Sequence, residues 1–75
     1  MEDQVKKAFS KVLYELRSEH GLSQQQLASK CDLERAYISR LERALAQPSL
    51  LTLVKLSKGL EEDLTSLIGK FESEV

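Results

Sequence analysis

Apolar residues recur every three or four positions along most of the chain, which is the spacing of amphipathic α-helices. The strict alternation of apolar and polar residues that marks a half-buried strand is absent. Five helices are predicted, at about residues 4–20, 23–31, 34–43, 49–58 and 63–72. We therefore expect an all-α fold with a single domain over residues 1–75.

Residues that favour helix ends support these boundaries. Gly21 fits the left-handed position that follows a helix, and Gly59 is expected to close the fourth helix. The second helix begins with a capping box, in which the side chains of Ser23 and Gln26 bond each other's backbone N–H groups. The remaining N-caps are predicted at Glu34, Ser49 and Asp63.

The apolar face of each helix predicts the core. Its expected members are Val5, Phe9, Val12, Leu13 and Leu16 in the first helix, Leu27, Ala28 and Cys31 in the second, Ile38 and Leu41 in the third, Leu50, Leu53, Val54 and Leu56 in the fourth, and Leu64 and Leu67 in the fifth. The third helix differs from the others because its opposite face is rich in arginine.

Composition is that of a globular protein, since 41% of the residues are apolar and 31% are charged. No apolar run approaches the ~20 residues that a transmembrane helix needs. The first residues, Met1-Glu2-Asp3, are acidic and lack the apolar region of a signal peptide. We therefore expect a cytoplasmic protein without a membrane partner.

Cys31 is the only cysteine and His20 is the only histidine. One thiol cannot form an internal disulfide, and these two residues fall short of a structural zinc site. We expect Cys31 to be a small core residue and His20 to end the first helix. No glycine-rich phosphate loop or Ser/His/Asp set is present, so we predict no metal, cofactor, small-molecule ligand or catalytic activity.

The net charge of −1 hides an uneven distribution. Residues 1–60 contain ten Lys/Arg and seven Asp/Glu, whereas residues 61–75 contain one lysine and five acidic residues. The local charge of the binding surface matters more for binding nucleic acid than the net charge of the whole chain. An acidic C-terminal segment therefore does not exclude DNA as a partner.

Two short helices joined by a tight turn, from Ser23 to Arg43, predict a helix–turn–helix. In this motif the second helix lies in the major groove of DNA, with its N-terminal residues against the base edges. Its outward face here carries Arg35, Ala36, Ser39, Arg40 and Arg43. An arginine can bind guanine O6 and N7 with two hydrogen bonds, and an alanine can contact a thymine methyl group. Each basic residue taken alone is explained equally well as a solvated surface charge or as a DNA contact. Their location on one face of the same helix favours DNA binding.

The same region closely resembles the Cro/repressor-like helix–turn–helix family of the xenobiotic-response-element (XRE) type. The resemblance covers roughly residues 9–69 and is carried by Leu16-Arg17, Gly21-Leu22-Ser23-Gln24, Leu27-Ala28, Tyr37-Ile38-Ser39, Leu41-Glu42-Arg43, Pro48-Ser49-Leu50, Thr52-Leu53, Leu56 and Leu60. It implies a compact five-helix, lambda-repressor-like DNA-binding domain that regulates transcription.

Within this family, the short chain and its segment from Leu33 to Ser39 look most like the controller proteins of restriction–modification systems. These are homodimers that bind pseudo-palindromic operators, and they typically activate and then repress their own promoter and the endonuclease gene. The resemblance therefore implies operator DNA and a second copy of the chain as partners, with RNA polymerase as a further partner of an activator. The alternatives are a phage or chromosomal repressor, an antitoxin-like protein-interaction module and, with least support, an enzyme.

The resemblance also implies roles for individual residues. Those expected to contact base edges are Arg35, Ala36, Ser39 and Arg40, and those expected on the DNA backbone are Gln24, Tyr37 and Arg43. Gln24 suits this role because the free N–H groups at the start of a helix attract phosphate. Arg17 and Glu42 correspond to a structural ion pair between the first and third helices.

Three positions depart from the pattern of the family, and at one of them Glu34 stands where serine or threonine is common. Asp32 stands where glycine is common, and aspartate tolerates the left-handed conformation. Ala44 replaces a common glycine or asparagine, which leaves two alternatives for the third helix: it ends near Arg43, or it runs on toward Ala46. The loop over residues 44–47 contains no lysine or arginine, so DNA binding is expected to depend more on dimerisation.

The fifth helix, at residues 63–72, is predicted to be the dimerisation helix because it carries more apolar residues than a capping helix needs. The expected interface residues are Leu67, Ile68 and Phe71, while Leu64 and Leu67 also face the core of the monomer. Two copies related by a two-fold axis would read half-sites about one helical turn apart. Gly69 would allow close approach of the two copies.

Overall fold

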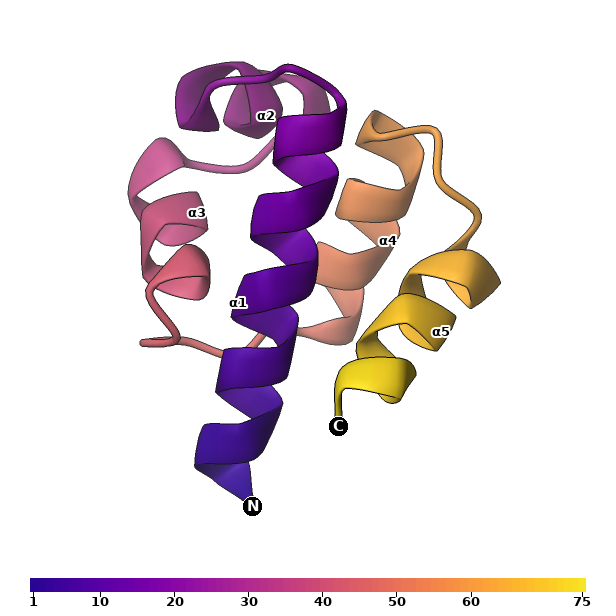
Figure 1. Ribbon diagram of the computed structural model, residues 1–75. Coiled ribbons are helices and arrows are strands. Elements are labelled where there is room, and N and C mark those ends of the chain that lie inside the picture. The colour runs from indigo at the N-terminus through magenta and orange to yellow at the C-terminus, as the bar shows by residue number, and fades with distance from the viewer.

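α1 (Glu2–Glu19) is the central helix of the molecule, with α3 on one side and α5 on the other (Figure 1). The computed structural model describes all 75 residues, and the other helices are α2 (Gln24–Cys31), α3 (Arg35–Glu42), α4 (Leu50–Gly59) and α5 (Leu64–Glu74). All five predicted helices are present, so the expectation of an all-α, five-helix fold is confirmed. No helix is both long enough and apolar enough to cross a membrane.

Local hydrogen bonds explain why α2 begins where it does. Ser23 Oγ accepts from the backbone N–H of Gln26 at 3.0 Å, and Gln26 Oε1 accepts from the backbone N–H of Ser23 at 2.8 Å. The predicted capping box is therefore confirmed. Ser49 caps α4 in a similar way, whereas the side chains of Glu34 and Asp63 occupy N-cap positions without forming a capping bond.

The end of α3 agrees with the shorter of the two alternatives predicted for it. The helix stops at Glu42 and does not run on toward Ala46, because Ala44 adopts a φ of 59°. The N–H of Ala44 bonds the carbonyl of Leu41, and the N–H of Leu45 bonds the carbonyl of Arg40, which is the hydrogen-bond pattern of a Schellman motif. A glycine is therefore not required for this chain to end a helix in a left-handed residue.

Gly59 ends α4 as predicted, but it does so without adopting the left-handed conformation. It is the last helical residue, and Glu61, with a φ of 53°, takes the left-handed position. Gly59 is instead needed for packing, since a Cβ atom there would lie 2.9 Å from both Cys31 Cα and the carbonyl oxygen of Lys30. The absence of a side chain lets α4 pack directly against the C-terminal turn of α2.

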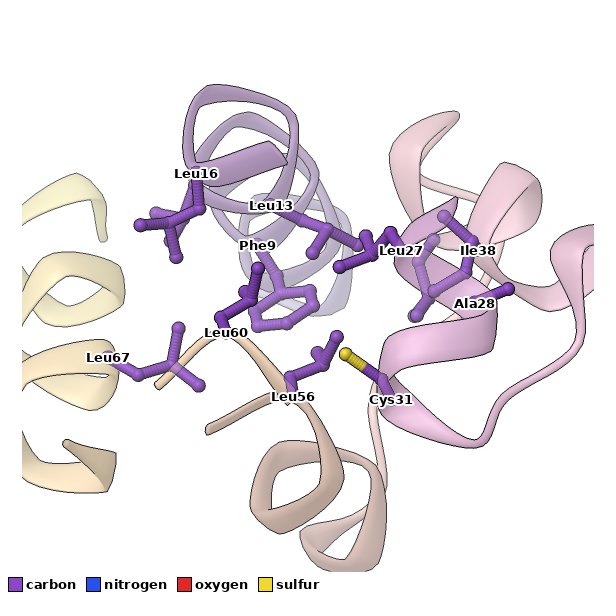
Figure 2. Close-up of a cluster of buried hydrophobic side chains, with 12 residues drawn as sticks. Phe9, Leu13, Leu16, Leu27, Ala28, Cys31, Ile38, Leu56, Leu60 and Leu67 are labelled. Atoms are coloured by element: carbon purple, nitrogen blue, oxygen red, sulfur yellow. The ribbon is translucent and has the colours of Figure 1, made fainter. Parts of the chain in front are cut away.

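One core holds the five helices together, and most of its side chains are shown in Figure 2. Its twelve buried members are Phe9, Val12, Leu13, Leu16, Leu27, Ala28, Cys31, Ile38, Leu41, Leu56, Leu60 and Leu67. Every helix contributes to this cluster, with Leu67 pointing inward from α5. Leu50 is the clear exception among the predicted apolar positions, because it is 74% exposed.

Candidate nucleic-acid interface

The turn between α2 and α3 is held by backbone and side-chain bonds. Asp32, with a φ of 55°, ends α2 in the left-handed conformation, and the N–H of Leu33 bonds the carbonyl of Ala28 at 2.9 Å. Lys55 of α4 donates from Nζ to the Asp32 carbonyl at 3.1 Å. The two helices are thus fixed as a helix–turn–helix, with α3 along one edge of the molecule (Figure 1).

α3 has one buried face and one exposed face. Ile38 and Leu41 are completely buried in the core and fix the orientation of the helix. The predicted base-contacting residues Arg35, Ala36 and Arg40 are exposed, and Ser39 is half-buried. The structure therefore brings these four side chains to the outer side of α3.

Arg43 folds back along the helix that precedes it. Its Nε donates to the carbonyl oxygen of Ser39 at 3.3 Å and to Ser39 Oγ at 3.2 Å. Because the Ser39 hydroxyl accepts this bond, its proton remains available to an outside acceptor. Arg43 is exposed at the C-terminal end of α3, near the base-contacting candidates.

Tyr37 connects α3 to the start of α4. Its hydroxyl shares a hydrogen bond of 3.0 Å with Thr52 Oγ1, which in turn lies 2.9 Å from Oγ of the N-cap residue Ser49. Thr52 is the only buried polar residue. Sequence reasoning placed Tyr37 on the DNA backbone and missed this internal bond, for which no local pattern exists because the partners are fifteen residues apart.

Arg17 and Glu42 form an ion pair between α1 and α3. Arg17 donates from Nε to Glu42 Oε2 at 2.6 Å and from Nη2 to Oε1 at 2.8 Å. The two side chains are only 16% and 6% exposed, so water screens the pair poorly. The hydrogen bond to Glu42 raises the pKa of Arg17 above its usual value.

The same network includes α2. Arg17 Nη1 donates to the carbonyl of Leu22 at 2.9 Å, and Gln24 Nε2 donates to Glu42 Oε1 at 3.1 Å. Gln24, the first residue of α2, therefore contacts the last residue of α3. The sequence offers no signal for this contact, which links the predicted phosphate anchor to the helix that is predicted to read bases.

The residues predicted for the dimer interface divide between core and surface. Leu67 is only 1% exposed and belongs to the core, so its assignment to the interface is wrong. Ile68, the next residue, is 38% exposed. Phe71 is half-buried and packs against Phe9, with ring centroids 6.3 Å apart.

Sequence reasoning missed a further apolar surface at the start of α4. Leu50 and Leu51 are 74% and 63% exposed. A groove lined by Val5, Phe9, Gln47, Pro48, Leu53, Leu67, Ile68 and Phe71 runs between α1, α4 and α5.

No three His, Cys, Asp or Glu side chains gather where they could hold a metal ion. Cys31 is buried, and burial raises the pKa of its thiol. The thiol therefore stays protonated near neutral pH and is a poor nucleophile.

Comparison with known proteins agrees with this geometry. A family model described as Helix-turn-helix (HTH_3) matches residues 13–67. The chain is 38% identical to control protein C.MunI of Mycoplasma sp over 71 residues, which cover 93% of this chain and 96% of that protein. It is also 38% identical to control protein C.BamHI of Bacillus amyloliquefaciens over 61 residues, which cover 80% of this chain and 75% of the relative.

Similarity extends to a solved structure. The wild-type restriction–modification controller protein C.Esp1396I superposes with a TM-score of 0.84 and 31% identity, covering 93% of this chain and 90% of that one. These relatives are regulatory proteins and not enzymes. The chain belongs to the HTH_3 helix-turn-helix family, and it is a DNA-binding transcription regulator that resembles the controller proteins of restriction–modification systems.

Proposed function

We propose that this protein controls a restriction–modification system by binding a pseudo-palindromic operator as a homodimer. The observation that carries the proposal is the two-faced α3, with Ile38 and Leu41 buried beneath an exposed surface that includes Arg35 and Arg40. A rigid helix with outward arginines is what reading the major groove requires. The proposal places this binding in the cytoplasm, at the operator.

Four residues of α3 are proposed to read bases. Arg35 is the first residue of the helix, where side chains reach the base edges, and it suits guanine. Ala36 follows it and can contact a thymine methyl group. Arg40 and Ser39 lie about one turn further along, and Ser39 retains a free hydroxyl proton.

Three residues around α3 are proposed to contact the DNA backbone. Gln24 stands at the N-terminus of α2, where free N–H groups and the helix dipole favour phosphate. Arg43 lies at the other end of the motif and is exposed. Tyr37 is half-buried and its hydroxyl bonds Thr52, so any phosphate contact would share this hydroxyl.

A second copy of the chain is proposed to cover the apolar surface formed by Leu50, Leu51 and Ile68. Leu50 stands one turn before Leu53, which lines the groove together with Ile68 and the half-buried Phe71. Exposed leucines of this kind are costly to leave in water, and an isologous contact buries the same residues on both copies. The same contact would give the two α3 helices the two-fold relation that a pseudo-palindrome needs.

If this protein activates transcription, it also contacts RNA polymerase, as the resemblance predicts. In vitro transcription with purified polymerase tests this part of the proposal. A promoter next to the operator should respond to the protein, and the same promoter with a scrambled operator should not.

A gel shift on the DNA upstream of the protein's own gene tests operator binding, with Arg35→Ala and Arg43→Ala as a matched pair. Arg35→Ala should lose discrimination at one or two base pairs, by about 1–3 kcal/mol. Arg43→Ala should weaken binding to operator and random DNA alike, and lower the salt slope by about 0.9.

The proposed reading assignment would be wrong if both variants lost the same affinity on specific and random DNA. The absence of any shift at low salt would instead favour the protein-interaction module.

A further inference from the structure

The carboxylate of Glu42 accepts hydrogen bonds from two other helices at the same time. Arg17 of α1 binds both carboxylate oxygens, and Gln24 of α2 donates to Oε1, the oxygen that also accepts from Arg17 Nη2. The backbone carbonyl of Glu42 accepts a further bond from Ser10 Oγ at 2.7 Å. Glu42 thus ties the end of α3 to the start of α2, in addition to pairing with Arg17.

A carboxylate determines which way the Gln24 side chain faces. An ionised carboxylate only accepts hydrogen bonds, whereas an amide has a donor end and an acceptor end. The donor end of Gln24, Nε2, therefore has to lie against Glu42. One of its two N–H groups is used in this bond, and the other stays available to a further acceptor.

Arg17 keeps this arrangement compatible with DNA. Its guanidinium balances the negative charge of Glu42 through two short hydrogen bonds. Without that balance, the carboxylate next to Gln24 would repel an approaching phosphate. The ion pair and the Gln24 amide therefore form one electrically neutral unit at the N-terminus of α2.

We propose that Glu42 is a positioning residue for DNA binding, which orients the Gln24 amide so that a backbone phosphate meets an N–H group and not the amide oxygen. The inference rests on the proposed phosphate contact of Gln24. It gives Glu42 a role beyond the ion pair, because the phosphate contact and the base-reading helix then share one carboxylate.

A double-mutant cycle tests the proposal with Gln24→Ala, Glu42→Gln and the double variant, each titrated with operator and random DNA. A glutamine at position 42 both donates and accepts, so it no longer enforces one orientation of Gln24. Gln24→Ala should weaken binding to both DNAs roughly tenfold, as expected for a lost hydrogen bond to a charged group. Glu42→Gln should weaken binding in the wild-type background and change it less than about twofold in the Gln24→Ala background.

Ser10→Ala is the matched control, since Ser10 contacts the carbonyl of Glu42 and not its carboxylate. This variant should bind DNA with unchanged affinity. A merely structural role of Glu42 would give the same loss in both Gln24 backgrounds, and that result would overturn the proposal. If the wild-type protein binds DNA and Gln24→Ala binds it equally well, the proposal is overturned but the DNA-binding function stands. If the wild-type protein does not bind the operator at all, the proposed function itself is rejected.

If Glu42→Gln does not fold, NMR of the Gln24 side-chain amide in the wild-type protein tests the proposed orientation of this amide. On addition of operator DNA, one of the two amide hydrogens should shift strongly, while the hydrogen bonded to Glu42 changes little. Equal shifts of both hydrogens, or no shift of either, would contradict the proposed orientation.

Discussion

At the scale of single residues, two glycines of this chain have opposite surroundings. Gly59 lies against the backbone of α2, where a Cβ atom would come within 2.9 Å of the carbonyl oxygen of Lys30. Apart from its chain neighbours and the backbone of its own helix, Gly69 of α5 has no atom within 4 Å of the position a Cβ would take. Both glycines are helical, so only their surroundings distinguish them.

Alanine at these two positions should therefore have opposite effects on stability. Gly59→Ala should lower the free energy of unfolding by about 1–3 kcal/mol, because the packed backbones of α2 and α4 must move apart. Gly69→Ala should raise it by up to about 1 kcal/mol, because alanine favours a helix. Urea denaturation followed by circular dichroism measures both, and a change in the same direction for both variants would contradict this account.

At the scale of elements, ion pairs connect α1 to two different helices. The pair from Arg17 to Glu42 of α3 is mostly buried, with side chains 16% and 6% exposed. The pair from Lys11 to Glu74 of α5 lies at the surface, with side chains 56% and 31% exposed. Their different burial predicts different contributions to stability, since water screens exposed charges.

Arg17→Met should leave the Glu42 carboxylate buried without its partner and lower the free energy of unfolding by about 3 kcal/mol. In a domain of this size, such a loss lowers the thermal midpoint by more than ~10 °C. Lys11→Met is the control and should leave the midpoint nearly unchanged. Similar midpoints for the two variants in a thermal melt would show that burial of the pair does not matter.

At the scale of the whole molecule, α3 and α5 lie on opposite sides of α1 (Figure 1). The acidic residues after residue 60 therefore belong to the side away from the proposed DNA surface. This separation explains how a chain with a net charge of −1 can bind DNA. It also leaves Ile68 of α5 and the exposed leucines of α4 free to contact a second copy.

Adjacent substitutions on α5 test the proposed dimer. Ile68→Asp should yield a folded monomer, because Ile68 is 38% exposed, and its operator affinity should fall. Leu67→Asp should prevent folding, because Leu67 is 1% exposed in the core and a charge there cannot be solvated. Analytical ultracentrifugation and circular dichroism distinguish these outcomes, and a dimeric Ile68→Asp would place the interface elsewhere.

Much of the architecture could be predicted because helices depend on neighbours within about four residues. The spacing of Phe9, Leu13 and Leu16 located α1, and the capping pair Ser23 and Gln26 located the start of α2. The exposed face of α3 could be predicted for the same reason. These features are local, so the sequence by itself determined the helices and the helix–turn–helix.

Contacts between distant residues were decided only by the tertiary structure. Gln24 and Glu42 are eighteen residues apart, and no spacing rule connects them. Packing also decided that Leu50, which was predicted on the apolar face of the fourth helix, is 74% exposed. The physical reason is the same in both cases: burial and orientation depend on how helices pack, whereas the positions of helices depend on hydrogen bonds and side chains within each segment.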